Sequence, residues 1–296
     1  MITKLIKDIF HRNHFIIVAM RRFILTLLLV TVFVPSVSGQ RNEPRVAGRG
    51  QGSAARLEGN IYVLTIFLSE NARGNNTSYW TSAETDVWFR KLRKAENWLQ
   101  KEAARYGKRI SFTGGYFGLD PLVAVDEIES GTGSGNERVD WVKVALTAVG
   151  YESPMAFLKW VQTKTDCQSA LIIVVADKKG RSYAIPFSDI NNREDFFVEG
   201  IMAYTQYESG TGLYPASIAH EICHVFGAED LYANFSQTEK NEAIARQRFP
   251  DDIMIRIEAN LENLQIGPFT AWLLGLTDQE EPWYRSLLPP PRDRTR

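Results

Sequence analysis

The sequence predicts an α/β (α+β) fold in which helices cover a twisted mixed sheet. Short runs rich in β-branched and aromatic residues alternate with longer segments whose apolar residues recur at helical spacing. One run, 170–176, is apolar throughout, which is typical of a central strand covered on both faces. The chain has 296 residues, of which 44% are hydrophobic, and this suffices for one good core or two small domains.

The individual elements follow from the same patterns. The run 61–68 predicts a strand, and 86–106 predicts a long amphipathic helix because Trp88, Leu92 and Trp98 recur at helical spacing. The remaining elements are expected in this order: a strand at 109–113 that is broken by the glycine pair 114–115, a loop over 118–136, helices at 139–149 and 155–163, the strand at 170–176, a hairpin turn at 177–180, a strand at 181–187 that Pro186 marks as an edge, and a strand at 197–204.

The segment His220-Glu221-Ile222-Cys223-His224 has the spacing of a metal site on a helix. Positions four apart lie about 40° from each other around a helix, so His220 and His224 can bind one metal ion. Glu221 lies about 100° round from His220 and therefore flanks the metal, where a general base stands to take a proton from a metal-bound water. A helix-compatible segment with Pro215 in its first turn precedes the motif.

A third ligand is expected shortly after the helix. Gly227 favours the left-handed conformation that ends a helix, and the chain can then fold back to bring Asp230 to the metal. The fourth position would stay open for water, as in catalytic zinc sites. Glu229 is a competitor for this role. A glutamate on a later helix is the other solution, and the candidates are Glu239, Glu242, Glu258 and Glu262.

With the segment Asp252-Ile253-Met254 further on, the sequence resembles the metzincin clan of zinc metallopeptidases. The extended motif of that clan is H-E-x-x-H-x-x-G-x-x-H/D, followed by a methionine turn beneath the metal. The resemblance implies that Met254 is the hydrophobic floor under the ligands and that 265–275 forms the C-terminal helix. It covers about residues 60–278, although only 220–230 and 252–254 are specific.

The sequence departs from the commonest metzincin pattern at Asp230, where most members have a histidine. Small secreted proteases of the snapalysin type have an aspartate there, so the resemblance holds. Some metzincins also carry a tyrosine just after the methionine turn that stabilises the oxyanion, and no tyrosine comes just after Met254 in this sequence. Tyr232 and Tyr214 are the nearest tyrosines, and half-buried amphipathic side chains are the favoured interpretation of both.

The N-terminal segment indicates export. Arg21 and Arg22 precede an apolar run and a small-residue cleavage site, so a secreted or periplasmic location is expected, with no stable membrane association after cleavage. An uncleaved signal anchor is the alternative. The expected organisation is a signal peptide or leader at 1–39, a linker or short pro-segment at 40–58, the catalytic domain at 59–288 and a disordered tail at 289–296.

The two cysteines, Cys167 and Cys223, could pair in an exported protein, but Cys223 lies inside the metal helix. A buried free thiol is therefore the preferred interpretation. The net charge of −1 and the lack of a basic stripe argue against nucleic acid as a partner.

These patterns predict a secreted zinc-dependent endopeptidase with one catalytic Zn2+ and a protein or peptide substrate. Tyr183, Ala184 and Ile185 of the edge strand would bind the substrate main chain by backbone hydrogen bonds, and an ordinary capped edge is the alternative. Three other functions stay open. They are an exported non-catalytic peptide-binding module with a structural metal site, a gluzincin-type protease with a downstream glutamate ligand, and a mononuclear iron oxygenase, whose facial triad also uses two histidines and a carboxylate.

Overall fold

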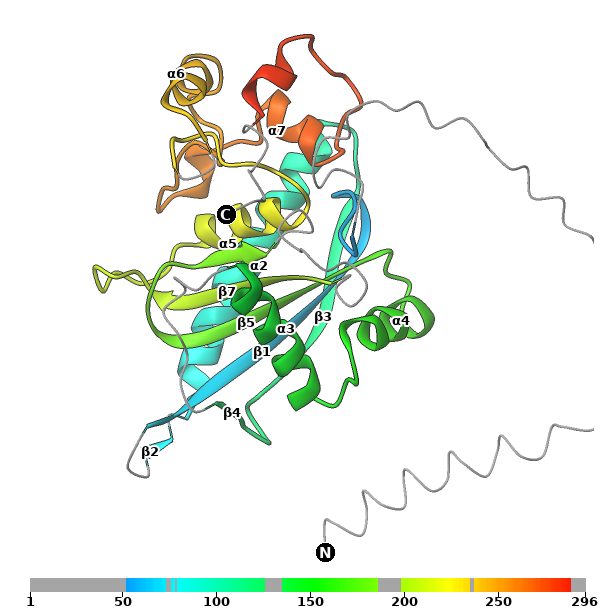
Figure 1. The fold of residues 1–296 in the computed structure, drawn as a ribbon, viewed down its shortest axis with the longest axis vertical. Helices are drawn as coiled ribbons and strands as arrows, with labels where there is room; N and C mark the ends of the chain where they lie inside the picture. Colours follow the sequence, from blue (N-terminus) through cyan, green and yellow to red (C-terminus); the bar gives the residue numbers. More distant parts are fainter. Residues whose placement is uncertain are drawn as a thin grey trace, which may run out of the picture. The chain divides into compact units, whose positions relative to one another are not determined.

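A mixed sheet organises the part of the chain that the computed structural model describes, which comprises residues 52–72, 76–77, 79–125, 135–185, 198–234 and 237–288 (Figure 1). All of these residues belong to one compact unit, Pro44–Arg296. The strands are β1 (Gly59–Ala72), β2 (Asn76–Thr77), β3 (Ile110–Phe117), β4 (Val123–Val125), β5 (Ser169–Lys179), β6 (Tyr183–Ile185) and β7 (Glu199–Gln206). The α-helices are α2 (Ser82–Arg105), α3 (Gly135–Ala148), α4 (Pro154–Lys164), α5 (Pro215–Val225), α6 (Glu239–Arg248) and α7 (Pro268–Leu273).

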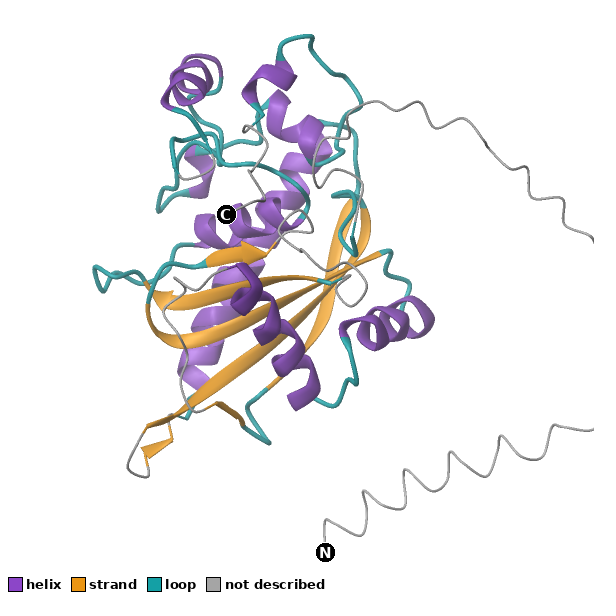
Figure 2. Cartoon of the chain, viewed as in Figure 1, coloured by secondary structure: helices purple, strands orange, loops and turns teal. Residues whose placement is uncertain are grey.

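The sheet order is β2-β1-β5-β7-β6, with β3 and β4 also paired to β1. The long strand β1 is parallel to β3, β4 and β5, and β5 is parallel to β7. The short strand β6 is antiparallel to β7 and lies at the end of the order, so it is an edge strand, as expected. A mixed α/β fold with a mixed sheet is therefore confirmed, and helices lie on both sides of it (Figure 2).

Alternate residues of the central strands face two separate cores, as the period of two in a strand requires. On one side, residues such as Leu171 and Ile173 of β5 pack with α2, α5 and α7, and we call this the α5 face. On the other side, Ile172 and Val174 pack with α3 and α4, and we call this the α4 face. The segment 170–176 of β5 is buried on both sides and is apolar throughout.

Two sequence predictions about the strands are wrong. Residues 177–180 do not form a hairpin turn between neighbouring strands: β5 continues to Lys179, and β6 pairs with β7 instead of β5. The apolar strand β7 takes the place beside β5, where both of its faces are buried. The glycine pair 114–115 does not break β3 either. It permits a close approach, because a Cβ on Gly114 would lie 1.8 Å from the Val63 carbonyl oxygen.

Other predictions differ in extent. The segment expected as a loop, 118–136, contains β4 and the start of α3, and the C-terminal helix expected over 265–275 is the shorter α7. Residues 52–58, expected in a linker or pro-segment, pack into the domain: Ala54 and Leu57 are buried on the α5 face. The expected leader, the disordered tail and Pro186 lie outside the described residues.

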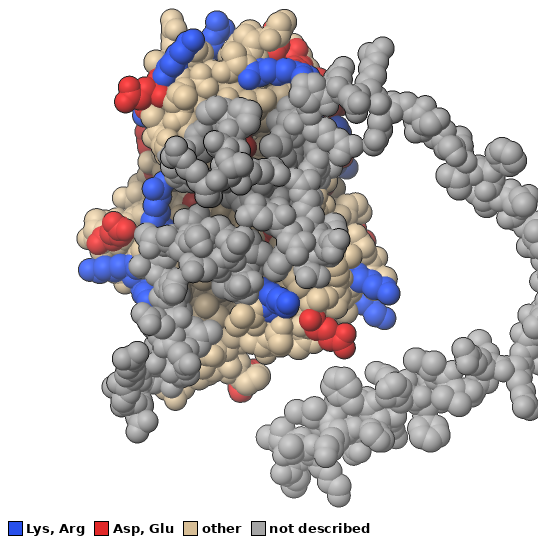
Figure 3. Space-filling model, in the orientation of Figure 1, with Lys and Arg blue, Asp and Glu red and all other residues tan. Residues whose placement is uncertain are grey.

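The two cysteines are free and buried, Cys167 on the α4 face and Cys223 on the α5 face, which confirms the preferred interpretation. Basic and acidic side chains are interspersed on the view in Figure 3 where described atoms are visible. Among the described residues, no helix is both long and apolar enough to cross a membrane.

Candidate metal centre

Helix α5 carries both histidines, and the sequence sets its two ends. Pro215 lies in the first turn, where a missing backbone N–H costs no hydrogen bond. At the other end, Gly227 has a φ of 94°, which glycine adopts without strain. Its N–H donates to the His224 carbonyl at 2.9 Å. The next N–H, from Ala228, donates to the Cys223 carbonyl at 3.0 Å, which completes a Schellman motif and turns the chain back toward the helix.

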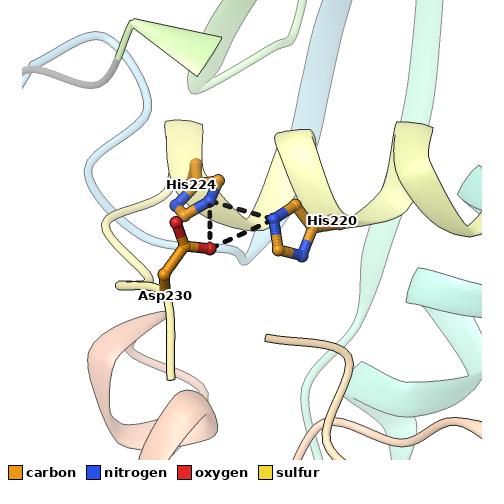
Figure 4. A group of neighbouring side chains, drawn as sticks. All are labelled: His220, His224 and Asp230. Carbon is orange, nitrogen blue, oxygen red and sulfur yellow. Dashed lines mark hydrogen bonds and ion pairs between the residues drawn. The ribbon is translucent and has the colours of Figure 1, made fainter. Parts of the chain in front are cut away.

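Three potential ligand atoms meet beside this helix (Figure 4). The Nε2 atoms of His220 and His224 are 3.1 Å apart. Asp230 Oδ1 lies 3.3 Å from the first of them and 3.1 Å from the second. A tetrahedral ion with bonds of about 2.0–2.1 Å separates its ligand atoms by about 3.3 Å. The three distances therefore fit one metal ion, and His220, His224 and Asp230 form a group that could hold it.

Backbone carbonyls fix both imidazole rings. His220 Nδ1 is 3.0 Å from the Ile253 carbonyl oxygen, and His224 Nδ1 is 2.8 Å from that of Ala228. Because a carbonyl oxygen only accepts, each Nδ1 carries the proton. In the neutral rings, each Nε2 then directs a lone pair toward Asp230 Oδ1 and toward the other ring. Three electron pairs at this spacing repel one another, so a cation between them, either a metal ion or a proton, would stabilise the arrangement.

The interaction between His224 and Asp230 shifts the pKa of both groups. Burial lowers the pKa of His224, but the charge of Asp230 and the hydrogen bond to it outweigh burial and raise that pKa to about 10. Burial raises the pKa of Asp230, but the His224 charge and hydrogen bonds from both imidazoles hold it well below its usual range. The arrangement thus favours positive charge at its centre, and a proton and a metal ion would compete for that position.

Asp230 is oriented by neighbours that follow it in the chain. Its Oδ2 accepts a hydrogen bond from Asn234 Nδ2 at 2.7 Å, so Oδ1 remains turned to the histidines. Its backbone carbonyl accepts from Gln237 Nε2 at 3.3 Å. The buried Gln237 also donates to the Leu287 carbonyl at 2.9 Å, which ties this loop to the C-terminal part of the domain. Such contacts behind a ligand fix its direction and support metal affinity.

Glu221 is buried beside the ligands, with 7% of its surface exposed. Among the described residues, no group donates a hydrogen bond to its carboxylate. Its charge contributes to raising the pKa of His224 and of Tyr232, which places the carboxylate within electrostatic reach of the ligands. A carboxylate with this placement can accept a proton from a water molecule at the metal position.

The turn that contains Asp252, Ile253 and Met254 lies against the same group. The Ile253 carbonyl accepts the proton on His220, and the Met254 carbonyl accepts from the Leu231 N–H at 2.9 Å. Met254 is fully buried on the α5 face. Its role as the hydrophobic floor under the ligands stays a prediction. Burial raises the pKa of Asp252 to about 6, although hydrogen bonds to the carboxylate, such as that from the Met254 amide, oppose the shift.

The other candidate third ligands do not join the group that the described residues form, which includes Asp230 but neither Glu229 nor a later glutamate. Three of the downstream candidates are bonded to other groups. Glu242 accepts from the Ala233 N–H and Arg246, Glu258 pairs with Arg256, and Glu262 pairs with Lys101.

Tyr232 lies closer to the ligand histidines than the sequence indicates. Tyr232 and Tyr214 are both partly buried, as expected, but the Tyr232 ring also stacks on His220 with centroids 6.5 Å apart. Its hydroxyl accepts a hydrogen bond from Arg181 Nη2 at 3.3 Å. Burial and the Asp230 charge raise the pKa of Tyr232, so it stays protonated. Its position two residues after Asp230 was the only available signal, and no local pattern could have indicated Arg181.

The predicted substrate strand β6 lies next to α5, which contacts both β6 and β7. Tyr183 and Ala184 are partly exposed, and Ile185 is buried. Pairing with β7 occupies one edge of this strand. Binding of a peptide along β6 stays a prediction.

No family model matches this sequence. A search of the curated proteins also gives no match.

Proposed function

We propose that the chain is a secreted zinc-dependent endopeptidase with a site of the metzincin type. The observation that carries the proposal is the meeting of His220 Nε2, His224 Nε2 and Asp230 Oδ1 at 3.1–3.3 Å, with the Nδ1 proton of each ring held by a carbonyl. Neutral imidazoles and a carboxylate are the ligands of catalytic zinc sites with three protein ligands. The order of the motif and the following turn support the metzincin type.

His220, His224 and Asp230 would hold one Zn2+, which when bound polarises the scissile carbonyl and makes water easier to deprotonate. Glu221 takes a proton from the attacking water and later gives it to the leaving amine. Its burial beside the ligands, without a competing donor among the described residues, suits this task. The Ile253 and Ala228 carbonyls keep both rings in the tautomer that leaves Nε2 unprotonated.

The substrate would be an extended protein or peptide segment. Its main chain would add to β6 by backbone hydrogen bonds, which need no particular side chains. Proline or charged substitutions at Tyr183 and Ala184 should raise KM for peptides. An unchanged KM would remove this part of the proposal.

The decisive experiment replaces Glu221 with glutamine, which keeps the size of the side chain but removes the base. We expect Glu221→Gln to bind zinc with the wild-type stoichiometry and to hydrolyse casein about 10²- to 10⁴-fold more slowly. Glu239→Gln, at an exposed position on α6, is the matched control and should be fully active. Hydrolysis at the wild-type rate by the Glu221→Gln protein would refute the mechanism.

The alternatives give different results in the same preparation. Elemental analysis separates zinc from the iron of a mononuclear oxygenase, in which Glu221 would have no role. A protein that binds zinc but yields no cleavage sites in proteomic profiling would be a non-catalytic module with a structural metal. Loss of hydrolysis on chelation and its return with zinc support the endopeptidase. The secreted location is tested by N-terminal sequencing of the exported protein.

A further inference from the structure

We propose that Asp252 is a positioning residue for the metal centre, because its buried carboxylate fixes the turn whose carbonyls hold two of the three ligand segments. The inference rests on the proposed metal site and adds a residue that touches neither metal nor substrate. Asp252 is fully buried on the α5 side of the molecule and lies 22 positions after Asp230 in the sequence.

The carboxylate of Asp252 organises backbone on both sides of it. Oδ1 accepts from the Met254 N–H at 2.8 Å, which closes the turn over Ile253. Oδ2 accepts from the Gly267 N–H at 2.8 Å, at the residue that precedes the first turn of α7. Each oxygen therefore has its own amide donor, and both donors point at the carboxylate from within the domain. Hydrogen bonds to an ionised acceptor are stronger than those between neutral groups.

The backbone of this turn also fixes the orientation of two ligand segments. The carbonyl of Ile253, directly after Asp252, accepts the Nδ1 proton of His220 at 3.0 Å. The next carbonyl, that of Met254, accepts from the Leu231 N–H at 2.9 Å, and Leu231 directly follows Asp230. A change in the direction of these two carbonyls would rotate the His220 ring and shift the Asp230 segment together. Contacts of this kind set ligand orientation and basicity.

Gly267 belongs to the same set of contacts around the Asp252 carboxylate. A Cβ at Gly267 would lie 2.6 Å from Asp252 Oδ2, so any larger residue would displace the carboxylate. The backbone there is extended, with a φ of −73°, so the close approach is the reason that glycine is needed. Substitution of Gly267 is therefore a second way to displace the Asp252 carboxylate without removing it.

The test compares Asp252→Asn with Asp251→Asn in the full-length protein. Asparagine keeps the size of the side chain but presents an amide NH2 group to one of the two backbone donors. We expect Asp252→Asn to weaken Zn2+ binding roughly 10- to 100-fold and to lower kcat with little change in KM. The visible spectrum of the Co2+-substituted protein should also change, because the geometry at the ligands differs. Asp251 is half exposed and paired with Arg256, so Asp251→Asn should match the wild type in all of these measurements.

Melting curves with and without Zn2+ distinguish the proposed positioning role of Asp252 from a purely structural role. Our proposal expects the stabilisation by Zn2+ to be smaller in Asp252→Asn than in the wild type. An equal loss of melting temperature in both states, with unchanged Kd, kcat and Co2+ spectrum, would overturn it. If Asp252→Asn does not fold, Gly267→Ala gives the same measurements, and wild-type zinc affinity in that variant would likewise overturn the proposal. A wild-type protein that binds no metal would instead refute the proposed function.

Discussion

The two faces of the sheet are both closed by helices, but they bury different chemistry. On the α4 face, α3 and α4 cover the sheet with apolar side chains such as Leu146 and Phe157. On the α5 face, the helices and the turn also bury Glu102, His220, Glu221 and Asp252. Buried polar groups are costly unless each has a partner. Under the proposed function, the α4 face contributes to stability alone, whereas the α5 face would also hold the metal site.

The largest expected effect is the loss of the proposed zinc-dependent hydrolysis on the α5 face. Replacing His224 with alanine removes one of the three ligand atoms and should abolish zinc binding at micromolar metal. Because a bound metal contributes several kcal/mol to catalysis, peptide hydrolysis should fall about 10³-fold or more. Metal content by elemental analysis and hydrolysis rate are measured together. Full activity of a zinc-free His224→Ala protein would contradict the division between the faces.

A change on the α4 face should lower the stability of the protein and leave zinc binding and catalysis unchanged. Phe157 is fully buried, and its ring contacts Tyr62 and Tyr151 edge to face. Phe157→Ala should lower the free energy of unfolding by about 3–5 kcal/mol, because it leaves a cavity. The Zn2+ Kd and the kcat of the folded protein should remain those of the wild type. Urea unfolding followed by zinc titration tests both statements, with Phe157→Leu as the milder control, and a weakened Zn2+ affinity would show that the faces are coupled.

Glu199 sharpens the comparison, because it is a buried carboxyl group that is not part of the group formed by His220, His224 and Asp230. Its Oε2 accepts from the Ser53 N–H at 3.0 Å, and among the described residues Oε1 has no partner. Burial raises the pKa of Glu199 from 4.5 to about 8, although hydrogen bonds from Ser53 oppose the shift. The folded protein therefore binds a proton that the unfolded chain releases between these pH values.

Stability should accordingly fall as pH rises from about 4.5 to about 8, by an amount on the order of a few kcal/mol. Below the lower value both states are protonated, and the contribution is fully present. Urea unfolding at a series of pH values measures the slope, and Glu199→Gln should make it shallower over this range. Identical slopes in the two proteins would mean that Glu199 is ionised in the folded state.

The smallest effect is expected for Tyr232→Phe. The ring that stacks on His220 remains, and the hydroxyl, which accepts from Arg181 and also interacts with Asp230, is lost. We expect unchanged zinc content and a decrease in kcat/KM of about tenfold or less, equivalent to one hydrogen bond. Steady-state kinetics measures this, and a loss of metal in the variant would assign Tyr232 to the ligand scaffold instead.

Local patterns predicted the centre better than the sheet. The spacing of His220 and His224, the helix end at Gly227 and the return to Asp230 all lie within eleven residues, where helix geometry determines which groups can meet. The pairing of β6 was predicted wrongly, because a turn signal at 177–180 indicates a change of direction but not the partner strand.

Contacts between distant segments could not be predicted at all. Ser53 and Glu199 are 146 positions apart, and Arg181 and Tyr232 are 51 apart. Nothing in the periodicity of either segment indicates the other, since these pairs depend on the order of strands in the sheet. The sequence places Gly267 within the expected C-terminal helix and does not indicate that its small size accommodates the Asp252 carboxylate.

The hydrogen bonds at the two imidazole rings have a consequence for the motion of the domain. The carbonyls that hold these rings belong to Ala228 and Ile253, so the ligands connect α5 to both ends of the segment 228–253. By linkage, an ion bound at the centre would stabilise this whole segment by RT ln(1 + [L]/Kd). Its backbone amides should then exchange with deuterium more slowly when metal is added, while those of α3 and α4 keep their rates.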